Sequence, residues 1–403
     1  MMKSLSNPRP SKNTILILII FLVAVAQSGL ALYLPSLPAI QEHFAKQAST
    51  IQLTVFYYVI GISASQWFYG PLSDIYGRRK IALGGLSLFI LGTVIAIFSM
   101  NIHMLLTARG IQGIGMGAVM TINRAILRDI FRGKEYVKNA SRLASAFAVS
   151  PVIFPLLGGY IQSLLGWQAN FIFMLILSVI ALFCWYFQFK ENHCCQKTFR
   201  LTHIVEDYID VAKSTIFWKN ALCGGLIYSG EVIFLTMAPF LIQAQFHLSA
   251  SSYGKVMLMA IFGFIAGSQY SSYLSEKLKH CELILLGLLF CFLSTIMMLI
   301  EAYVLSPHIT MIILTLSVYM FGAGLVYPNT SLGAVGHFPE KAGTASAFLS
   351  STQGFISAIG AGLVATLNHN TLDTMAIIFL VIVILSGLLG GYIFYQERNH
   401  VLK

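Results

Sequence analysis

The sequence has few charged residues. Only 10% of its 403 residues are Asp, Glu, Lys or Arg, 57% are hydrophobic, and the mean hydropathy is +0.77. A soluble domain carries about 25% charged residues, so this composition excludes a water-soluble globular protein. Most of the backbone must lie in lipid, as helices or a closed barrel. Continuous apolar runs, without an alternation of period two, favour helices.

Cysteine and acidic residues are also scarce. The six cysteines lie in apolar runs or short loops, with no sign of a disulfide framework. His193, Cys194 and Cys195 have no second pair of ligands, so an ordinary reduced loop is favoured over a metal site; we expect neither metal nor cofactor. The formal charge is +10, but the cations are scattered over short loops, so nucleic acid is not the expected partner. The cysteines are Cys184, Cys194, Cys195, Cys223, Cys281 and Cys291.

Apolar runs of about 20 residues, enough to cross a bilayer core of about 30 Å, recur twelve times. The first follows Lys3, Arg9 and Lys12 as in a signal peptide, but no clear cleavage site follows, so we expect it to be retained. Only the loops 129–139 and 190–219 are long. The predicted fold is all-α and integral to the membrane, with twelve helices in two pseudo-symmetric halves, 1–189 and 220–403, joined by a cytoplasmic linker, 190–219. The spans are predicted at 14–36, 51–71, 80–100, 103–125, 140–164, 168–189, 220–243, 254–274, 282–303, 309–329, 343–367 and 374–395.

Lysine and arginine determine the predicted orientation. With the N-terminus inside, only Lys46 and Lys255 fall in outer loops, which agrees with the positive-inside rule. We therefore expect a multi-pass protein of a bacterial inner membrane with both termini in the cytoplasm. The cations placed inside are Arg78, Arg79, Lys80, Arg128, Arg132, Lys134, Lys138, Lys190, Lys197, Arg200, Lys213, Lys219, Lys277, Lys279, Lys341, Arg398 and Lys403.

A charged motif, Gly70-Pro-Leu-Ser-Asp-Ile-Tyr-Gly-Arg-Arg-Lys80, connects the second and third runs. It places Asp74 four residues before Arg78, and it resembles the signature loop of the major facilitator superfamily. A degenerate repeat of this motif, residues 267–279, follows the eighth run. The alternative is an ordinary charged loop between two spans. The resemblance implies a transporter with two six-helix halves.

The fourth run contains Arg109, with Gln112 and Gly113 on the same helical face. An unpaired cation in a span costs about 2.5–3.5 kcal/mol on insertion scales. Arg109 therefore faces protein or water, or else it snorkels to the surface. Arg followed by Gln-Gly resembles the family's fourth-helix pattern. It implies that Arg109 faces the central cavity and influences a nearby protonation site.

The same run ends with Arg124, Arg128 and Asp129. We expect these residues to contact the Asp74 loop in one conformation, as an ion network that biases the resting state. A solvated helix end that obeys the positive-inside rule is an equal alternative.

The fifth run contains Ser150-Pro-Val-Ile-Phe-Pro-Leu-Leu-Gly-Gly159, which predicts a kink and close packing. This stretch resembles the fifth-helix motif of facilitator antiporters. Together with Tyr33-Leu-Pro-Ser-Leu-Pro38 and Arg124-Ala-Ile-Leu-Arg-Asp129, it resembles the Bcr/CflA drug-resistance branch, whose members are drug:proton antiporters. The predicted gating residues are Gly70, Asp74, Gly77, Arg78, Arg128, Asp129, Pro151, Pro155, Gly158 and Gly159.

One departure from that branch concerns the coupling carboxylate. The branch usually has an acidic residue in the first helix where this sequence has Ala31. Glu231 is the one carboxylate deep in an apolar run, since Glu301 lies nearer the end of its run. Burial favours the neutral form of a carboxyl group, so Glu231 can bind and release a proton. We expect Glu231 to have taken over coupling; the alternative is a permanently protonated Glu231 that only bonds a neighbouring helix.

These features predict a proton-coupled exporter of small amphipathic drugs that works by alternating access. Its partners are a small-molecule substrate, protons and the lipid bilayer, and we expect a monomer. Two alternatives stay open: export of an endogenous metabolite such as a carboxylate siderophore, which Arg109 and Arg124 would suit, and uncoupled facilitative import. No Walker loop, His-Glu-x-x-His or Gly-x-Ser-x-Gly indicates an enzyme. The predicted substrate-binding residues are Gln27, Tyr57, Tyr58, Asn123, Arg124, Tyr228, Tyr327, Asn329 and Gln353.

Overall fold

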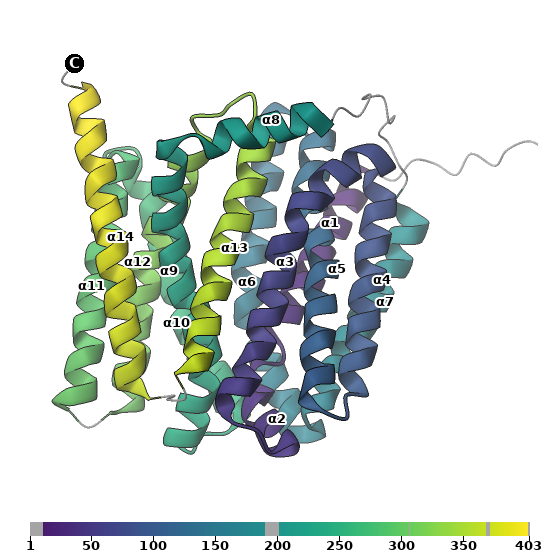
Figure 1. The fold of residues 1–403 in the computed structure, drawn as a ribbon, viewed down its shortest axis with the longest axis vertical. Helices are drawn as coiled ribbons and strands as arrows, with labels where there is room; N and C mark the ends of the chain where they lie inside the picture. The colour runs from purple at the N-terminus through teal and green to yellow at the C-terminus, as the bar shows by residue number, and fades with distance from the viewer. Residues whose placement is uncertain (1–10, 190–200, 306, 368–370, 402–403) are drawn as a thin grey trace, which may run out of the picture.

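The computed structural model describes residues 11–189, 201–305, 307–367 and 371–401. Within these ranges every regular element is helical, and twelve helices are long and apolar enough to cross a membrane. They run side by side, with α8 lying across one end of the bundle and α2 at the other (Figure 1). We call these the linker end and the α2 end. The predicted all-α fold with twelve spans is confirmed.

The chain crosses from one end to the other with each long helix. A 3₁₀ turn, Leu34–Ser36, links α1 to the short α2, and a π-helical turn, Leu241–Gln245, extends α9. The helices are α1 (Lys12–Ala31), α2 (Leu37–Phe44), α3 (Ala48–Tyr76), α4 (Arg78–Ile97), α5 (Ile102–Ile130), α6 (Gly133–Leu165), α7 (Trp167–Gln188), α8 (Leu201–Ala212), α9 (Thr215–Phe240), α10 (Ala250–Leu274), α11 (His280–Tyr303), α12 (Ile309–Val335), α13 (Ala342–Thr366) and α14 (Leu372–Val401).

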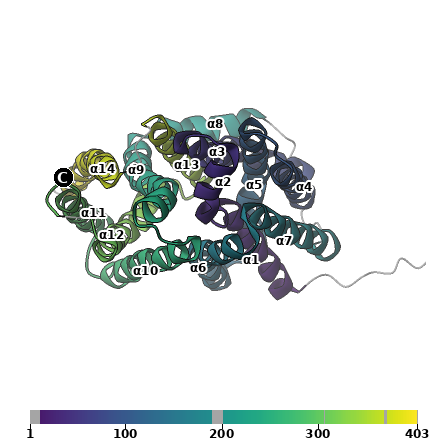
Figure 2. The same ribbon diagram turned by 90° about the horizontal axis from the view of Figure 1, so that it is seen from below.

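The bundle is elongated when it is seen from the α2 end. Figure 2 shows α4 and α7 toward one extreme and α11 and α14 toward the other. Helices that precede α8 in the sequence pack against helices that follow it: α3 packs with α13, and α6 packs with α10. The division into halves at 190–219 stays a prediction.

Several helices are longer than the apolar runs that predicted them. The motif at residues 70–80 is not an open loop, because α3 continues to Tyr76 and α4 starts at Arg78. Only Gly77 joins them, at φ 91°, a conformation that favours glycine. The predicted loop 129–139 shrinks similarly, since α5 ends at Ile130 and α6 starts at Gly133. An apolar run indicates the part of a helix that crosses lipid, whereas the helix itself extends into water.

The predicted linker contains a helix of its own, α8. Its Tyr208 ring lies 5.8 Å from the ring of Phe348 on α13, and Phe217 of α9 stacks on the same ring at 5.1 Å. Trp67 of α3 also contacts Phe348, at 6.0 Å. Lys341 forms ion pairs with Asp207 (2.9 Å) and Asp210 (2.6 Å) of α8. Aromatic packing and these pairs therefore hold α8 against the linker end of α13.

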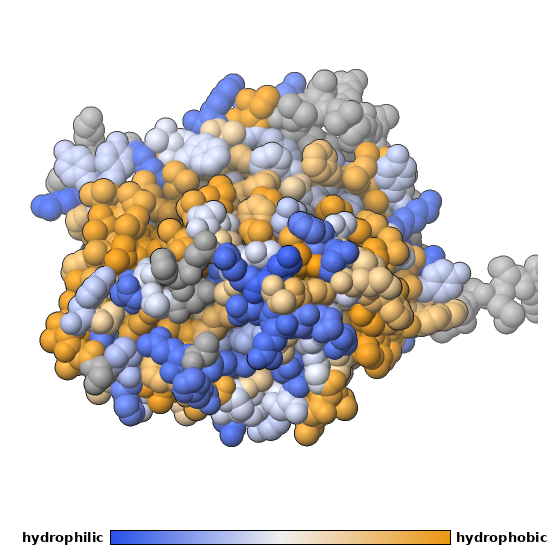
Figure 3. Space-filling model, turned by 60° about the horizontal axis from the view of Figure 1, so that its bottom comes forward, coloured by the Kyte–Doolittle hydropathy of each residue, from blue (hydrophilic) through white to orange (hydrophobic). Residues whose placement is uncertain are grey.

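Small residues let the helices approach closely, as expected where lipid removes the hydrophobic drive between helices. A Cβ on Gly113 of α5 would lie 2.2 Å from the Tyr58 carbonyl oxygen of α3, and one on Gly115 would lie 2.5 Å from the Gly85 carbonyl oxygen of α4. Large apolar side chains such as Phe183 and Leu388 are exposed on the outer sides, where lipid solvates them. Hydrophilic residues gather at the α2 end instead, with hydrophobic residues around them (Figure 3).

Seven residues named in the predictions fall outside the described residues. The basic residues Lys190, Lys197, Arg200 and Lys403 lie there, as do His193, Cys194 and Cys195. The other cysteines, Cys184, Cys223, Cys281 and Cys291, are free thiols.

Candidate functional site

The motif at residues 70–80 forms an ion network at the linker end. Arg78, whose side chain is only 5% exposed, pairs with Asp74 at 2.6 Å and with Asp129 of α5 at 3.2 Å. It also bonds the Ser73 hydroxyl. The network therefore ties the α3–α4 junction to the end of α5. Of the three α5 residues expected to reach this loop, Asp129 is the one that pairs with Arg78 in this conformation.

The two arginines of α5 contact α13 instead. Arg124 donates to the hydroxyls of Ser346 and Ser350, and the guanidinium of Arg128 lies against Gly343. Both contacts join α5, which precedes α8 in the sequence, to α13, which follows it. The sequence did not indicate these serines as partners, since hydroxyls in a span are common and carry no pattern of their own.

The proline and glycine motif of α6 lies where α6 meets α1 and α10. A Cβ on Gly158 would lie 1.8 Å from the Leu32 carbonyl oxygen, and one on Gly159 would lie 2.3 Å from the Ala250 carbonyl oxygen. Gly254 of α10 packs in turn on the backbone of Pro155 and Leu156. Pro151 and Pro155 lie inside α6. The close packing expected of this motif is present, toward the α2 end.

Arg109 is completely enclosed within the first six spans. Its guanidinium donates to the Gln112 side-chain oxygen (2.6 Å) and to the Gly29 (2.8 Å) and Thr54 (3.4 Å) carbonyl oxygens. The rings of Tyr33 and Tyr58 lie 4.1 Å and 4.2 Å from it. Its side chain has no exposed surface. Charged hydrogen bonds and cation–π contacts both stabilise such a group. These contacts support a structural role; its expected influence on protonation stays a prediction.

Glu231 is only half-buried, although it lies in the middle of α9. Residues three and four positions away share its helical face. Ile227, Phe234 and Leu235 on that face are buried, and Tyr228 is half-buried. A lipid-facing side chain would have exposed neighbours above and below it. The exposed part of Glu231 therefore faces an internal gap in the protein.

Three tyrosines lie within electrostatic range of this carboxyl group. Tyr228 of α9 and Tyr319 and Tyr327 of α12 lie close enough for Glu231 to act on each electrostatically. The Tyr228 and Tyr327 rings are 6.0 Å apart. Gly230 leaves room for the Tyr319 hydroxyl, since a Cβ there would lie 2.1 Å from it. Tyr319 was not predicted, although its position eight residues before Tyr327 on one helix was a usable signal.

The other predicted lining residues are more scattered. Tyr58 acts electrostatically on Tyr228, while its hydroxyl donates to the Ala26 carbonyl oxygen at 2.9 Å. Gln353 is buried beside Gly224 of α9. The Asn123 side chain is 1% exposed, and among the described residues neither its oxygen nor its nitrogen has a partner. Gln27 is half-buried, and Tyr57 is 40% exposed.

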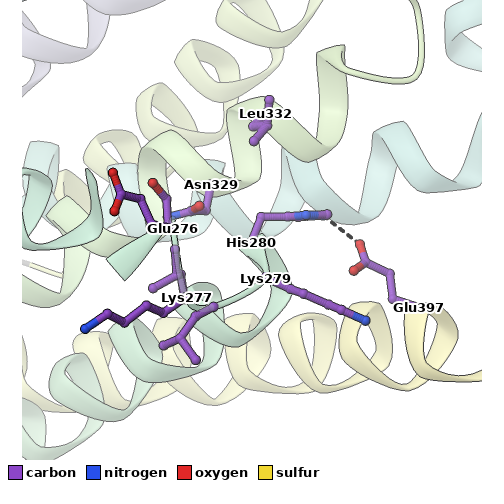
Figure 4. A pocket seen from close by; sticks show the side chains of 10 residues that line it. Glu276, Lys277, Lys279, His280, Asn329, Leu332 and Glu397 are labelled. Atoms are coloured by element: carbon purple, nitrogen blue, oxygen red, sulfur yellow. Dashed lines mark ion pairs between the residues drawn. The ribbon is translucent and has the colours of Figure 1, made fainter. Parts of the chain in front are cut away.

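Asn329 lies away from this group, in a pocket at the linker end. Its side chain donates to the Ser271 hydroxyl (2.7 Å) and the Leu325 carbonyl oxygen (2.8 Å). The pocket, of about 580 Å³, lies between the α10–α11 connection, α12 and α14. Figure 4 shows the ion pair of His280 and Glu397 at its wall, 2.6 Å long. A role for Asn329 in the same site as Glu231 stays a prediction.

The twelve spanning helices, the motif at residues 70–80 and the contacts between helices on opposite sides of α8 are those of a membrane transporter. Residues 16–361 match the model of the Major Facilitator Superfamily, and the chain belongs to that family, whose members are generally transporters and not enzymes. It is a multi-pass membrane protein with twelve spans.

Named relatives place the chain more finely. It is 26% identical to multidrug resistance protein D of Escherichia coli, over 88% of each chain. It is 23% identical to the bicyclomycin resistance protein homolog of Haemophilus influenzae, over 92% of this chain and 93% of the relative. It is also 23% identical to chloramphenicol resistance protein CraA of Acinetobacter baumannii, over 81% of this chain and 80% of the relative. These names confirm the predicted resemblance to the drug-resistance branch.

A solved structure shows the same fold. The crystal structure of a D-xylose-proton symporter matches with a TM-score of 0.75 at 13% identity, over 94% of this chain and 97% of that one. At this identity the match concerns the fold alone.

Proposed function

We propose that this protein exports small amphipathic drugs by alternating access, in exchange for protons that bind to Glu231. The relatives named for resistance to several drugs, to bicyclomycin and to chloramphenicol support drug export. Proton exchange is typical of the family, and it needs a group that can change its charge inside the membrane. Glu231 is the described residue that best meets this need.

The observation that carries the proposal is the half-buried state of Glu231 among tyrosines in an otherwise buried part of α9. A carboxyl group with all its oxygens bonded would be fixed in one state. Among the described residues, no group donates a hydrogen bond to Glu231, so it is available to bind and release a proton. The neighbouring tyrosine rings offer the apolar surface with a few polar groups that small-molecule sites prefer.

The orientation follows from the two ends of the bundle. Connections at the linker end carry Arg78, Arg79, Lys277, Lys279 and Lys341, whereas Lys46 and Lys255 lie at the α2 end. By the positive-inside rule the linker end faces the cytoplasm. Both chain termini then lie in the cytoplasm of a bacterial cell, and the protein resides in the inner membrane. Separately, we propose that it acts as a monomer.

The gating residues fit this orientation. The pairs of Arg78 with Asp74 and Asp129 stabilise the cytoplasmic end of the first six spans, and α6 meets α1 and α10 at its Gly158–Gly159 pair. The halves 1–189 and 220–403 rock about these contacts, and 190–219 connects them. Each crossing exposes the Glu231 region to one side of the membrane.

The test uses purified protein in proteoliposomes, with labelled chloramphenicol as the probe and an imposed pH gradient. The wild type and Glu301→Gln should accumulate the probe against its gradient, and Glu231→Gln should not. Glu301 is the matched control because it is another buried acid of a span, 3% exposed. Gradient-driven accumulation that survives Glu231→Gln would refute the coupling assignment.

The same assay separates the alternatives. Movement of the probe that is unchanged when the proton gradient is collapsed would indicate an uncoupled carrier. Failure with chloramphenicol and with amphipathic cations, together with export of a carboxylate iron chelator, would indicate the metabolite exporter.

A further inference from the structure

The last part of α9 closes the gap beside Glu231 toward the α2 end. Residues 232–242 are all buried, whereas Glu231 just before them is half-buried. This run covers the whole circumference of the helix over about 16 Å. A helix that is buried on every side is surrounded by protein, and not by lipid or water on one face. Along α9, therefore, the way from Glu231 to the α2 end is blocked by the helix itself and its packing.

The hydrogen bonding of α9 is interrupted within this closed part. Pro239 lies inside the helix and has no N–H, so the Leu235 carbonyl oxygen loses its usual helical donor. Leu241–Gln245 then form a π-helical turn, whose bonds span five residues instead of four. His247 leaves the turn at φ 52°, a left-handed conformation that is unfavourable for any residue with a side chain. A proline and a π-turn are both sites at which a helix bends.

A single side-chain hydrogen bond joins this turn to the first half of the molecule. Gln243 Nε2 donates to the Pro35 carbonyl oxygen at 2.9 Å, in the 3₁₀ turn between α1 and α2. The other glutamine of the turn, Gln245, is exposed. One amide–carbonyl bond contributes little net stability, so it can break and form again within a transport cycle.

The acceptor side of this bond is held more firmly than the donor side. Asn170 of α7 donates to the Ser36 hydroxyl at 2.7 Å and to the Gly158 carbonyl oxygen of α6 at 3.2 Å. Gly158 also packs directly on the Leu32 carbonyl oxygen. The 3₁₀ turn that contains Pro35 is thus fixed to α6 and α7, and the end of α9 is the part that is free to move.

We propose that residues 239–246 form a lid that opens the α2 end locally, with Gln243 as its latch and Pro239 as its hinge. This inference rests on the proposed function, because the group that the lid covers is Glu231. While Gln243 bonds Pro35, the buried end of α9 keeps water at the α2 end away from Glu231. When the bond breaks, the turn bends at Pro239, and a proton from that side reaches Glu231.

The packing of α6 explains why a local lid is needed. The Gly158–Gly159 pair, about which the halves are proposed to rock, meets α1 and α10 toward the α2 end. A rotation moves the parts near its axis least, so rocking about this contact opens the linker end more than the α2 end. A hinged turn gives access at the α2 end while the contact between α6 and α10 stays closed.

The test is hydrogen exchange on the full-length protein, without substrate and without a gradient. Amide exchange in residues 241–246 reports the lid, and exchange in residues 156–160 of α6 and 251–256 of α10 reports separation of the halves. Gln243→Met keeps the length of the side chain but removes the donor. It should raise exchange in the lid about threefold to tenfold, as expected for the loss of one hydrogen bond, and leave the other two segments unchanged.

Two variants of the same segment serve as controls. Gln245→Met makes the identical change two residues further along, at an exposed side chain, and should leave exchange in the lid as it is in the wild type. Pro239→Ala restores the missing helical donor and should slow exchange in the lid, the opposite of the effect of Gln243→Met. Where Gln243→Met does not accumulate, Gln243→Asn replaces it, because the shorter side chain does not reach Pro35.

A second measurement connects the lid to Glu231. A water-soluble carbodiimide reacts with protonated carboxyl groups, and mass spectrometry gives its rate of reaction with Glu231 at a mildly acidic pH. Gln243→Met should raise this rate about as much as it raises exchange in the lid, and Pro239→Ala should lower it. Gln245→Met should react like the wild type.

Three results would overturn the inference. They are equal exchange in the wild type and Gln243→Met, an equal rise in the segments of α6 and α10, and an unchanged reaction of Glu231 when the lid is loosened. None of them affects proton-coupled export at Glu231, which is measured as accumulation in proteoliposomes. Conversely, accumulation that survives Glu231→Gln would refute the proposed function and leave the exchange behaviour of the lid unchanged.

Discussion

In each half of the molecule a tyrosine hydroxyl packs beside a glycine of a spanning helix, an arrangement that we call a notch. The charged residue beside the notch differs between the halves. In the first half the Tyr58 hydroxyl donates to the Ala26 carbonyl oxygen at 2.9 Å and fills the space beside Gly29. In the second half the Tyr319 hydroxyl donates to the Ile227 carbonyl oxygen at 3.3 Å and fills the space beside Gly230. In each case the acceptor precedes the glycine by three residues.

The charges beside these notches are satisfied to different degrees. Arg109 bonds the Gly29 carbonyl oxygen and two further acceptors, lies between two tyrosine rings and is completely buried. Glu231 follows Gly230 directly, is half-buried, and accepts no hydrogen bond from the described part of the chain. A charge with every partner in place fixes a structure, whereas a charge without partners can change its protonation state. Under the proposed function, Arg109 is therefore the structural ion of the pair and Glu231 the functional one.

The largest expected effect comes from removing the satisfied charge. Arg109→Ala should leave several buried acceptors without donors, each at a cost of about 1–3 kcal/mol. We expect little folded protein, measured as monodisperse yield and melting temperature in detergent. Glu231→Gln is the matched control and should be as stable as the wild type. An Arg109→Ala variant that is fully stable but inactive in transport would show that Arg109 acts in proton coupling and not only in the structure.

The notches themselves give the next largest effect. A Cβ at position 230 would lie 2.1 Å from the Tyr319 hydroxyl, and one at position 29 would lie 2.3 Å from the Tyr58 hydroxyl. Gly230→Ala and Gly29→Ala should each cost about 1–3 kcal/mol by overpacking, seen as lower melting temperatures.

The control for this prediction removes the obstructing oxygen. Tyr319→Phe should restore part of the stability lost in Gly230→Ala but none of that lost in Gly29→Ala. Rescue of both, or of neither, would show that the two notches are not separate packing units.

The smallest expected effect comes from the water-exposed ion pairs of Lys341 with Asp207 and Asp210. They extend the comparison of charges to a site outside the membrane. The hydrogen bonds that Lys341 donates to Asp207 and Asp210 raise the pKa of Lys341, and its bond to Asp210 lowers the pKa of Asp210. The contribution of Asp210 is lost as the pH falls through its lowered pKa, and that of Lys341 is lost as the pH rises through its raised pKa. Exposed pairs contribute little and are screened by salt.

We therefore expect Lys341→Gln to loosen α8 only slightly, with more hydrogen exchange in residues 206–212 and no change in melting temperature. High salt should produce the same loosening in the wild type and none in the variant. Loss of the fold in Lys341→Gln would show that this contact is more than a surface pair.

Much of the fold could be predicted from the sequence, because apolar runs indicate which residues cross lipid. The same patterns could not place helix ends such as Tyr76 or Gly133, since polar residues can stay helical in water. They indicated Glu231 as a candidate, because a lone acid in an apolar run stands out. They missed Tyr319, Ser346 and Ser350, because the rotation of each helix is determined by packing and not by composition.

The most direct test of the central claim is the pH dependence of exchange with no gradient across the membrane. Equilibrium exchange of chloramphenicol in proteoliposomes should depend on pH in the wild type, because Glu231 must change its protonation state in each cycle. In Glu231→Gln, exchange should continue but become independent of pH. If the variant keeps the wild-type pH profile, another group carries the proton and Glu231 is only a structural acid.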